Sequence, residues 1–208
     1  MAETIDPRRS VLVLVDYQAK LLPAIHDASG ALANATRLAD SARLLGIRVV
    51  GTEENPAGLG PNEPAIRSRS DATLAKRHFD ACADGLVALL TRTGDGARFS
   101  APPAEAPPLH AVIAGCETHV CLLQTALGLL AAGLRVFVVA DACGSRSPAD
   151  HAAALDRLHG AGAVVVTSEM VIFEWLGTCD HPKFREALGL VKARPASDDF
   201  PGGTASPG

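Results

Sequence analysis

Short apolar runs recur along this chain, and helical patterns separate them. The first run, Val-Leu-Val-Leu-Val at residues 11–15, presents no polar residue on either face. Such a run is typical of a parallel strand that is covered on both faces of its sheet. Further strands are predicted at residues 47–52, 111–114, 136–140 and 163–166. This order predicts an α/β fold, with a doubly wound, mostly parallel sheet and helices on both faces.

Helix signals lie between the predicted strands. Ser147 followed by Pro148 has the residue types favoured at an N-cap and at the first helical position. Leu123, Leu127 and Leu130 share one face of another predicted helix, which the sheet is expected to cover. Helices are predicted around residues 38–45, 82–91, 120–130, 148–159, 170–176 and 183–188.

No internal repeat or domain boundary interrupts this pattern. Residues 1–194 are therefore interpreted as a single domain, with a surface loop at residues 94–108. Residues 195–208 are rich in Pro and Gly and are predicted to be a C-terminal tail.

Charge and cysteine content narrow the function classes. The net charge is −4 and no basic cluster occurs, which argues against nucleic acid and anionic membranes as partners. The apolar runs are far shorter than the ~20 residues of a membrane-spanning helix, and residues 1–10 lack the apolar segment of a signal peptide. Five cysteines, an odd number, suggest reduced thiols and a cytoplasmic location.

Chemistry in such folds gathers beyond the carboxyl ends of the strands. Asp16 directly follows the first strand, Asp141 follows the strand at residues 136–140, and the segment at residues 115–121 follows the strand at residues 111–114. These positions are the first candidates for a functional site.

Cys121 is the strongest candidate nucleophile. It lies near a predicted helix N-terminus, where free N–H groups and the helix dipole favour an anion and are expected to lower the pKa of the thiol. The same N–H groups could bind the oxyanion of a tetrahedral intermediate. The alternative is a buried cysteine that acts only as a small apolar residue.

Asp16 and Lys76 are the candidate partners of this thiol. Asp16 could orient or deprotonate Cys121, or it could simply be a strand-end carboxylate held by loop N–H groups. Lys76 could balance the charges, or it could be a solvated surface residue. The chain has no GxGxxG, Walker-type, CxxC or HExxH motif, so neither a nucleotide cofactor nor zinc has motif support.

With these residues in place, the chain resembles the isochorismatase-like cysteine hydrolases. The matching segments are residues 13–18, Lys76 with Phe79, residues 115–121, residues 141–147 and residues 167–169. The run Gly-Cys-Glu-Thr-His-Val-Cys at residues 115–121 is the most specific of them. The resemblance extends over roughly residues 10–190, and residues 52–60 are similar to the isochorismatase-domain-containing branch, whose substrates are mostly unassigned.

The resemblance implies a Rossmann-type three-layer sandwich and an Asp–Lys–Cys triad. Asp16 would be the base, Lys76 the charge-balancing cation and Cys121 the nucleophile. A non-proline cis peptide before Glu117 would point the N–H groups of Glu117 and Cys121 at the oxyanion. The implied activity is hydrolysis of a small amide or related C–N bond through a thioester, without a cofactor, in a homo-oligomer.

Several positions depart from the wider superfamily. Residues 52–60 contain no His, which argues against the metal site of nicotinamidases, and Cys121 argues against isochorismate as the substrate. Asp80 stands where relatives often have Ser and could place another carboxylate near Lys76. Cys116 could pair with Cys121 under oxidation.

Two other functions therefore stay open. One is a non-catalytic member that binds a small acid or a partner protein in the same site. The other is a thiol redox sensor that uses Cys116 and Cys121.

Overall fold

The structure, a computed structural model, describes residues 4–91 and 109–193. Within these residues, six strands form one sheet in the order β3-β2-β1-β4-β5-β6, and every pair of neighbouring strands is parallel. The strands are β1 (Ser10–Val15), β2 (Arg48–Glu54), β3 (Ala72–Lys76), β4 (His110–Gly115), β5 (Arg135–Val139) and β6 (Val164–Val166). The predicted doubly wound parallel sheet is thus confirmed.

The two central strands, β1 and β4, are buried along their whole length. Their apolar side chains face helices on both sides, which explains why the run at residues 11–15 lacks the alternation of a half-exposed strand. Gly115 ends β4 opposite Val15 of β1. A Cβ atom there would lie 2.3 Å from the carbonyl oxygen of Val15, so only glycine fits.

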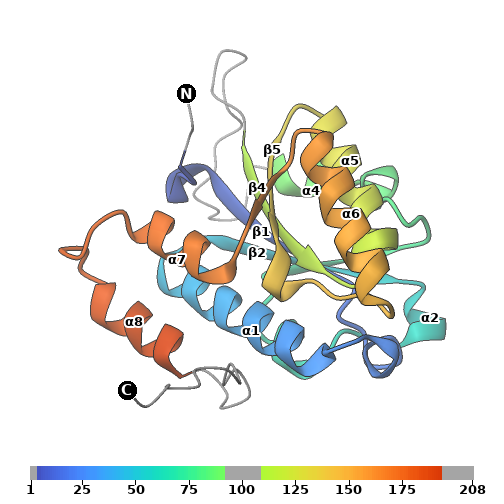
Figure 1. The fold of residues 1–208 in the computed structure, drawn as a ribbon, viewed down its shortest axis with the longest axis horizontal. Coiled ribbons are helices and arrows are strands. Elements are labelled where there is room, and N and C mark those ends of the chain that lie inside the picture. The colour runs from blue at the N-terminus through green and yellow to red at the C-terminus, as the bar shows by residue number, and fades with distance from the viewer. Residues whose placement is uncertain (1–3, 92–108, 194–208) are drawn as a thin grey trace, which may run out of the picture.

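Helices cover both faces of the sheet (Figure 1). One layer contains α1 (Ala28–Leu44), α7 (Ser168–Leu176) and α8 (Phe184–Lys192), and the other contains α4 (Leu86–Thr91), α5 (Leu123–Ala131) and α6 (Pro148–Gly160). Two short helices, α2 (Pro56–Leu59) and α3 (Pro64–Arg67), follow β2. Helix α6 begins as predicted, because the Ser147 side chain accepts a hydrogen bond from the Asp150 N–H and Pro148 occupies the first turn.

The helix after β4 differs from its prediction. It opens with a π-helical turn at Thr118–Leu122, and α5 continues from there. A π-helical turn holds an extra residue, so it rotates the face that follows. The core is formed by Leu122, Ala126 and Leu129, while Leu127 and Leu130 are only partly buried.

Other predictions have mixed outcomes. Strand β3 was not predicted, and the helix predicted at residues 82–91 is a 3₁₀ turn at Ala81–Asp84 followed by α4. The predicted loop at residues 94–108 and the tail at residues 195–208 lie outside the described residues. Within the described part of the chain, no helix is long and apolar enough to cross a membrane.

Candidate active site

The carboxyl ends of β1, β2 and β3 bring three charged residues together. The register of β2 and β3 pairs Glu54 with Lys76. The register of β1 and β2 pairs Val15 with Thr52, and Asp16 directly follows Val15. Because these strands are parallel neighbours, their last residues project toward one region at the same edge of the sheet.

Asp16 is fixed by backbone and side-chain hydrogen bonds. Its Oδ1 accepts from the Thr52 hydroxyl at 2.7 Å and from the Glu54 N–H at 3.1 Å. Its φ of 55° is in the left-handed region, which Asp tolerates better than most residues. These contacts leave Oδ2 facing Lys76, with its Nζ 2.8 Å away.

The side chain of Lys76 is fully buried. Lys76 is therefore not the solvated surface residue that the sequence left as an alternative. Its Nζ lies 2.8 Å from Oδ2 of Asp16 and 2.9 Å from Oε2 of Glu54, and it also donates to the carbonyl of His78. Burial alone would lower the pKa of this amine, but Asp16 and Glu54 outweigh burial and raise the pKa above its usual value. Lys76 is therefore held as an ammonium ion between two carboxylates.

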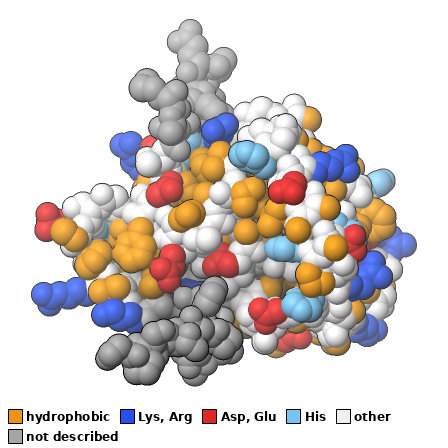
Figure 2. Space-filling view, in the orientation of Figure 1, with side chains coloured by type: hydrophobic (Ala, Val, Ile, Leu, Met, Phe, Trp, Pro, Cys, Tyr) orange, Lys and Arg blue, Asp and Glu red, His pale blue; other side chains and the backbone are white. Residues whose placement is uncertain are grey.

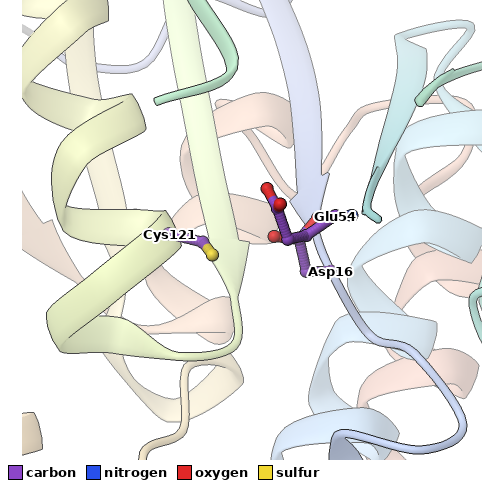
Figure 3. A group of neighbouring side chains, drawn as sticks. All are labelled: Asp16, Glu54 and Cys121. Carbon is purple, nitrogen blue, oxygen red and sulfur yellow. Dashed lines mark hydrogen bonds between the residues drawn. The ribbon is translucent and has the colours of Figure 1, made fainter. Parts of the chain in front are cut away.

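Cys121 follows β4, which neighbours β1 on the side opposite to β2 and β3. It lies in the π-helical turn that follows β4, and its Sγ points toward the carboxylates of Asp16 and Glu54 (Figure 3). A carboxylate oxygen of each and the Sγ atom all lie within 4.8 Å of one another. Asp16, Lys76 and Cys121, which are far apart in the sequence, thus converge at one place.

The environment of Cys121 corrects the expected pKa of its thiol. Burial raises this pKa above its ordinary value, the Asp16 carboxylate raises it further, and the Lys76 ammonium opposes them. The helix begins at Thr118, so Cys121 is its fourth residue, at the limit of the first turn over which the helix dipole acts. Low exposure, 6%, and two facing carboxylates therefore favour the neutral form of this thiol.

The loop before Cys121 contains the cis peptide bond implied by the resemblance, between Cys116 and Glu117. The Glu117 N–H donates no hydrogen bond to any described residue, so it is available to an oxyanion. The Glu117 carboxylate is occupied by the Arg146 guanidinium, with Nε and Oε2 2.7 Å apart. The Glu117 carboxylate is therefore paired with a cation and does not add an unpaired negative charge to the site.

Two histidine contacts anchor the turn that carries Cys121. The Thr118 hydroxyl lies 2.9 Å from Nδ1 of His151, and Nδ1 of His119 lies 3.0 Å from the Ser145 hydroxyl. Both imidazoles are therefore locally bonded, and they tie the turn to α6 and to the loop that precedes α6.

Comparison with known proteins identifies the family. The isochorismatase domain family matches residues 10–170. Isochorismatase domain-containing protein 2 from Homo sapiens is 38% identical over 193 residues, which are 92% of this chain and 87% of that protein. Isochorismatase domain-containing protein 2A from Mus musculus is 35% identical over 186 residues, 89% of this chain and 84% of that protein. This chain belongs to the isochorismatase family.

Solved structures agree with this assignment to the isochorismatase family. The MAR1 ribonuclease from Caenorhabditis elegans has a TM-score of 0.81 and 31% identity, with 98% of this chain and 100% of that chain covered. YcaC from Pseudomonas aeruginosa, solved with hexane-2,5-diol and covalent acrylamide, has a TM-score of 0.77 and 25% identity over 91% of this chain and 92% of that chain. An isochorismatase-like fold of the hydrolase type is therefore shown for this chain.

Within this isochorismatase-like site, Glu54 was not predicted from the sequence. Its neighbour Glu53 has the same side chain, and nothing in the sequence distinguishes the two. Alternation along β2 sends Glu54 toward Lys76, whereas Glu53 accepts a hydrogen bond from the Asn62 N–H. Only the strand assignment and register could have separated them.

Asp80 and Asp141 have structural contacts instead of contacts with Lys76. Asp80 accepts from the Cys82 N–H at 2.8 Å and caps the following 3₁₀ turn, and it does not form an ion pair with Lys76. Asp141 accepts from the backbone N–H and the hydroxyl of Ser168, at the start of α7. The extra carboxylate that Asp80 could have placed near Lys76 is thus supplied by Glu54.

Proposed function

We propose that this protein is a metal-independent cysteine hydrolase that cleaves a small amide or related C–N bond. The observation that carries the proposal is the convergence of Asp16, Lys76 and Cys121, in which a carboxylate anchored by two hydrogen bonds faces both an ammonium and a thiol. Nucleophile and base within reach of one another are the requirement of covalent acyl transfer.

In the proposed reaction, the Cys121 Sγ attacks the substrate carbonyl carbon and its proton passes to Oδ2 of Asp16. A raised thiol pKa requires such a base, because very little thiolate exists before substrate binds. The carbonyl oxygen becomes an oxyanion, which the N–H groups of Glu117 and Cys121 stabilise. Asp16 then returns the proton to the departing nitrogen, the C–N bond breaks and a thioester remains.

A water molecule completes the cycle. Asp16 takes a proton from the water, whose oxygen attacks the thioester carbonyl, and the C–S bond breaks. The proton returns to the sulfur and the acid product leaves. Lys76 keeps the Asp16 carboxylate in place throughout and offsets the negative charge that develops near the sulfur.

The donor atoms of the site support a reaction without a metal ion. Asp16, Glu54 and Cys121 could in principle ligate a cation, since their donor atoms lie within 4.8 Å of one another. The Lys76 ammonium, however, already lies 2.8 Å and 2.9 Å from the two carboxylates, so a divalent cation would meet a fixed positive charge.

Two similar solved structures bear on the substrate class. Covalent acrylamide in the Pseudomonas aeruginosa YcaC structure is a small neutral amide that alkylates nucleophiles, which supports amide-sized ligands. The ribonuclease name of the Caenorhabditis elegans structure would suggest RNA. We favour a small molecule, because the net charge is −4 and the Lys and Arg side chains on the face in Figure 2 are scattered and do not form one patch. We further propose a cytoplasmic homo-oligomer.

A substrate screen tests the proposal. Small amides, carbamates and ureas are incubated with the wild-type protein, with Cys121→Ala and Cys121→Ser, and with Cys179→Ala as a control at an exposed cysteine. We expect at least one compound to be hydrolysed by the wild type and the control, and neither Cys121 variant to turn it over. Turnover that survives Cys121→Ala would refute the assignment, and ligand binding without any turnover would favour a non-catalytic member.

A further inference from the structure

Glu54 has a carboxylate oxygen that the fold does not use. Its backbone N–H is bound by Asp16 and Gln18, and its Oε2 forms the ion pair with Lys76 at 2.9 Å. Its Oε1 accepts no hydrogen bond from any described residue, and the side chain keeps 11% of its surface exposed. A carboxylate oxygen of Glu54 lies within 4.8 Å of the Cys121 Sγ. An accessible acceptor therefore remains close to the reactive sulfur.

The charges around the sulfur do not balance. By formal charge, Asp16 and Glu54 supply two negative charges and Lys76 supplies one positive charge. Burial raises the pKa of the Cys121 thiol and so favours its neutral form. Glu117 is neutralised by its pair with Arg146. One negative charge is thus in excess, in a place where water and salt screen charges poorly.

We propose that Glu54 is a specificity-determining residue, which admits substrates that present an N–H donor or a positive charge beside the scissile carbonyl and disfavours those with a carboxylate there. The inference rests on the proposed function, and it narrows the substrate class to primary amides and ureas without a neighbouring acid group, including those that carry a protonated amine. The Oε1 atom would accept the N–H of such a substrate.

A role limited to holding Lys76 makes a different prediction. Glu54→Gln keeps an oxygen that can accept from Lys76, but it removes the excess negative charge. If Glu54 only positioned Lys76 and other groups set the charge preference of the site, that preference would not change in this variant. Glu53→Gln is the matched control, because it removes the adjacent charge while its amide oxygen can still accept from Asn62.

Competitive alkylation measures this preference without a known substrate. Iodoacetamide and iodoacetate differ in one negative charge, and the exposed Cys179 in the same molecule normalises their intrinsic reactivity. After normalisation, we expect Cys121 of the wild type to prefer iodoacetamide roughly tenfold, a ratio typical of one poorly screened charge. Glu54→Gln should bring the ratio close to one, and Glu53→Gln should leave it at the wild-type value. An equal ratio in the wild type, or an unchanged ratio in Glu54→Gln, overturns the inference.

The same experiment separates this inference from the proposed function. If neither reagent labels Cys121 even above pH 9, where its thiolate fraction still grows, while Cys179 reacts, the nucleophile assignment and the inference fail together. If Cys121 reacts without charge preference, only the role of Glu54 fails. Should Glu54→Gln not fold, 2-bromoethylammonium is added on the wild type: normalised labelling of Cys121 by this cation above iodoacetate supports the inference, and equal or lower labelling overturns it.

Discussion

The ammonium of Lys76 lies 2.8 Å from Oδ2 of Asp16, and both side chains are completely buried. Such a pair pays a large desolvation cost, which its mutual attraction and further hydrogen bonds must offset. Here Glu54 joins from the other side of Lys76, so the pair is a network of three charged groups. Removing Lys76 leaves both carboxylates without their cation.

Lys76→Met should therefore lower the free energy of unfolding by about 3–5 kcal/mol, because it leaves two carboxylates buried without their cation. Urea unfolding at pH 7 measures this change. Lys183→Met is the matched control, since Lys183 pairs with Glu186 at the surface and should contribute at most about 1 kcal/mol. A loss for Lys76→Met as small as that of the control would contradict the prediction.

The raised pKa of Cys121 predicts a distinct alkylation profile. The rate of iodoacetamide labelling should still increase above pH 9, because the thiolate fraction keeps growing where an ordinary thiol with a pKa of ~8.5 is already ionised. Lys76→Ala removes the group that lowers this pKa and should shift the profile to still higher pH. Mass spectrometry of the peptide that contains Cys121 gives the rates. A labelling rate that reaches its plateau below pH 8 would show instead that the helix N-terminus lowers the pKa of Cys121 more than burial raises it.

Cys143 makes the stability sensitive to alkaline pH. Burial raises the pKa of its thiol to about 12, whereas in the unfolded chain the thiol titrates near its model value of 9.0. Between these values the unfolded chain releases a proton that the folded protein keeps, so stability falls as pH rises, by about 1.4 kcal/mol per pH unit for this thiol. Urea unfolding of Cys143→Ala under reducing conditions should show a shallower fall by that amount. Cys179→Ala, at an exposed cysteine, should keep the wild-type slope, and equal slopes in all three proteins would exclude this role.

Gly115→Ala tests the close approach of β1 and β4. The added Cβ would meet the Val15 carbonyl oxygen at 2.3 Å, and backbone cannot move aside as a side chain does. We expect a loss of at least about 1–3 kcal/mol in the free energy of unfolding, together with loss of Cys121 reactivity, because the loop to Cys121 begins there. Gly160→Ala is the control, since its Cβ would meet nothing within 4 Å. Equal stability of the two variants would argue against a tight contact.

The sequence predicted the parts of the fold that local patterns encode. The continuous apolar run at residues 11–15 predicted a strand buried on both faces, and Ser147 with Pro148 predicted the start of α6, because these signals act within one element. Strand β3 was missed, since Ala72–Lys76 at the edge of the sheet is buried only at Lys76 and contains no apolar run. The helix face after β4 was misplaced by the π-helical turn, which no local pattern marked.

The candidate site divides in the same way. Asp16 and Cys121 could be found from the sequence, because each lies just beyond a recognisable strand and parallel strands end at the same edge of the sheet. The contact of Glu54 with Lys76 depends on the register between two strands, and hence on backbone hydrogen bonds over a separation of 22 residues. The pKa of Cys121 likewise depends on burial and on carboxylates from other strands. The sequence alone determined which residue types stand at the strand ends, whereas the tertiary structure decided their charge balance, because electrostatic energies depend on distance and solvent exposure, which exist only after folding.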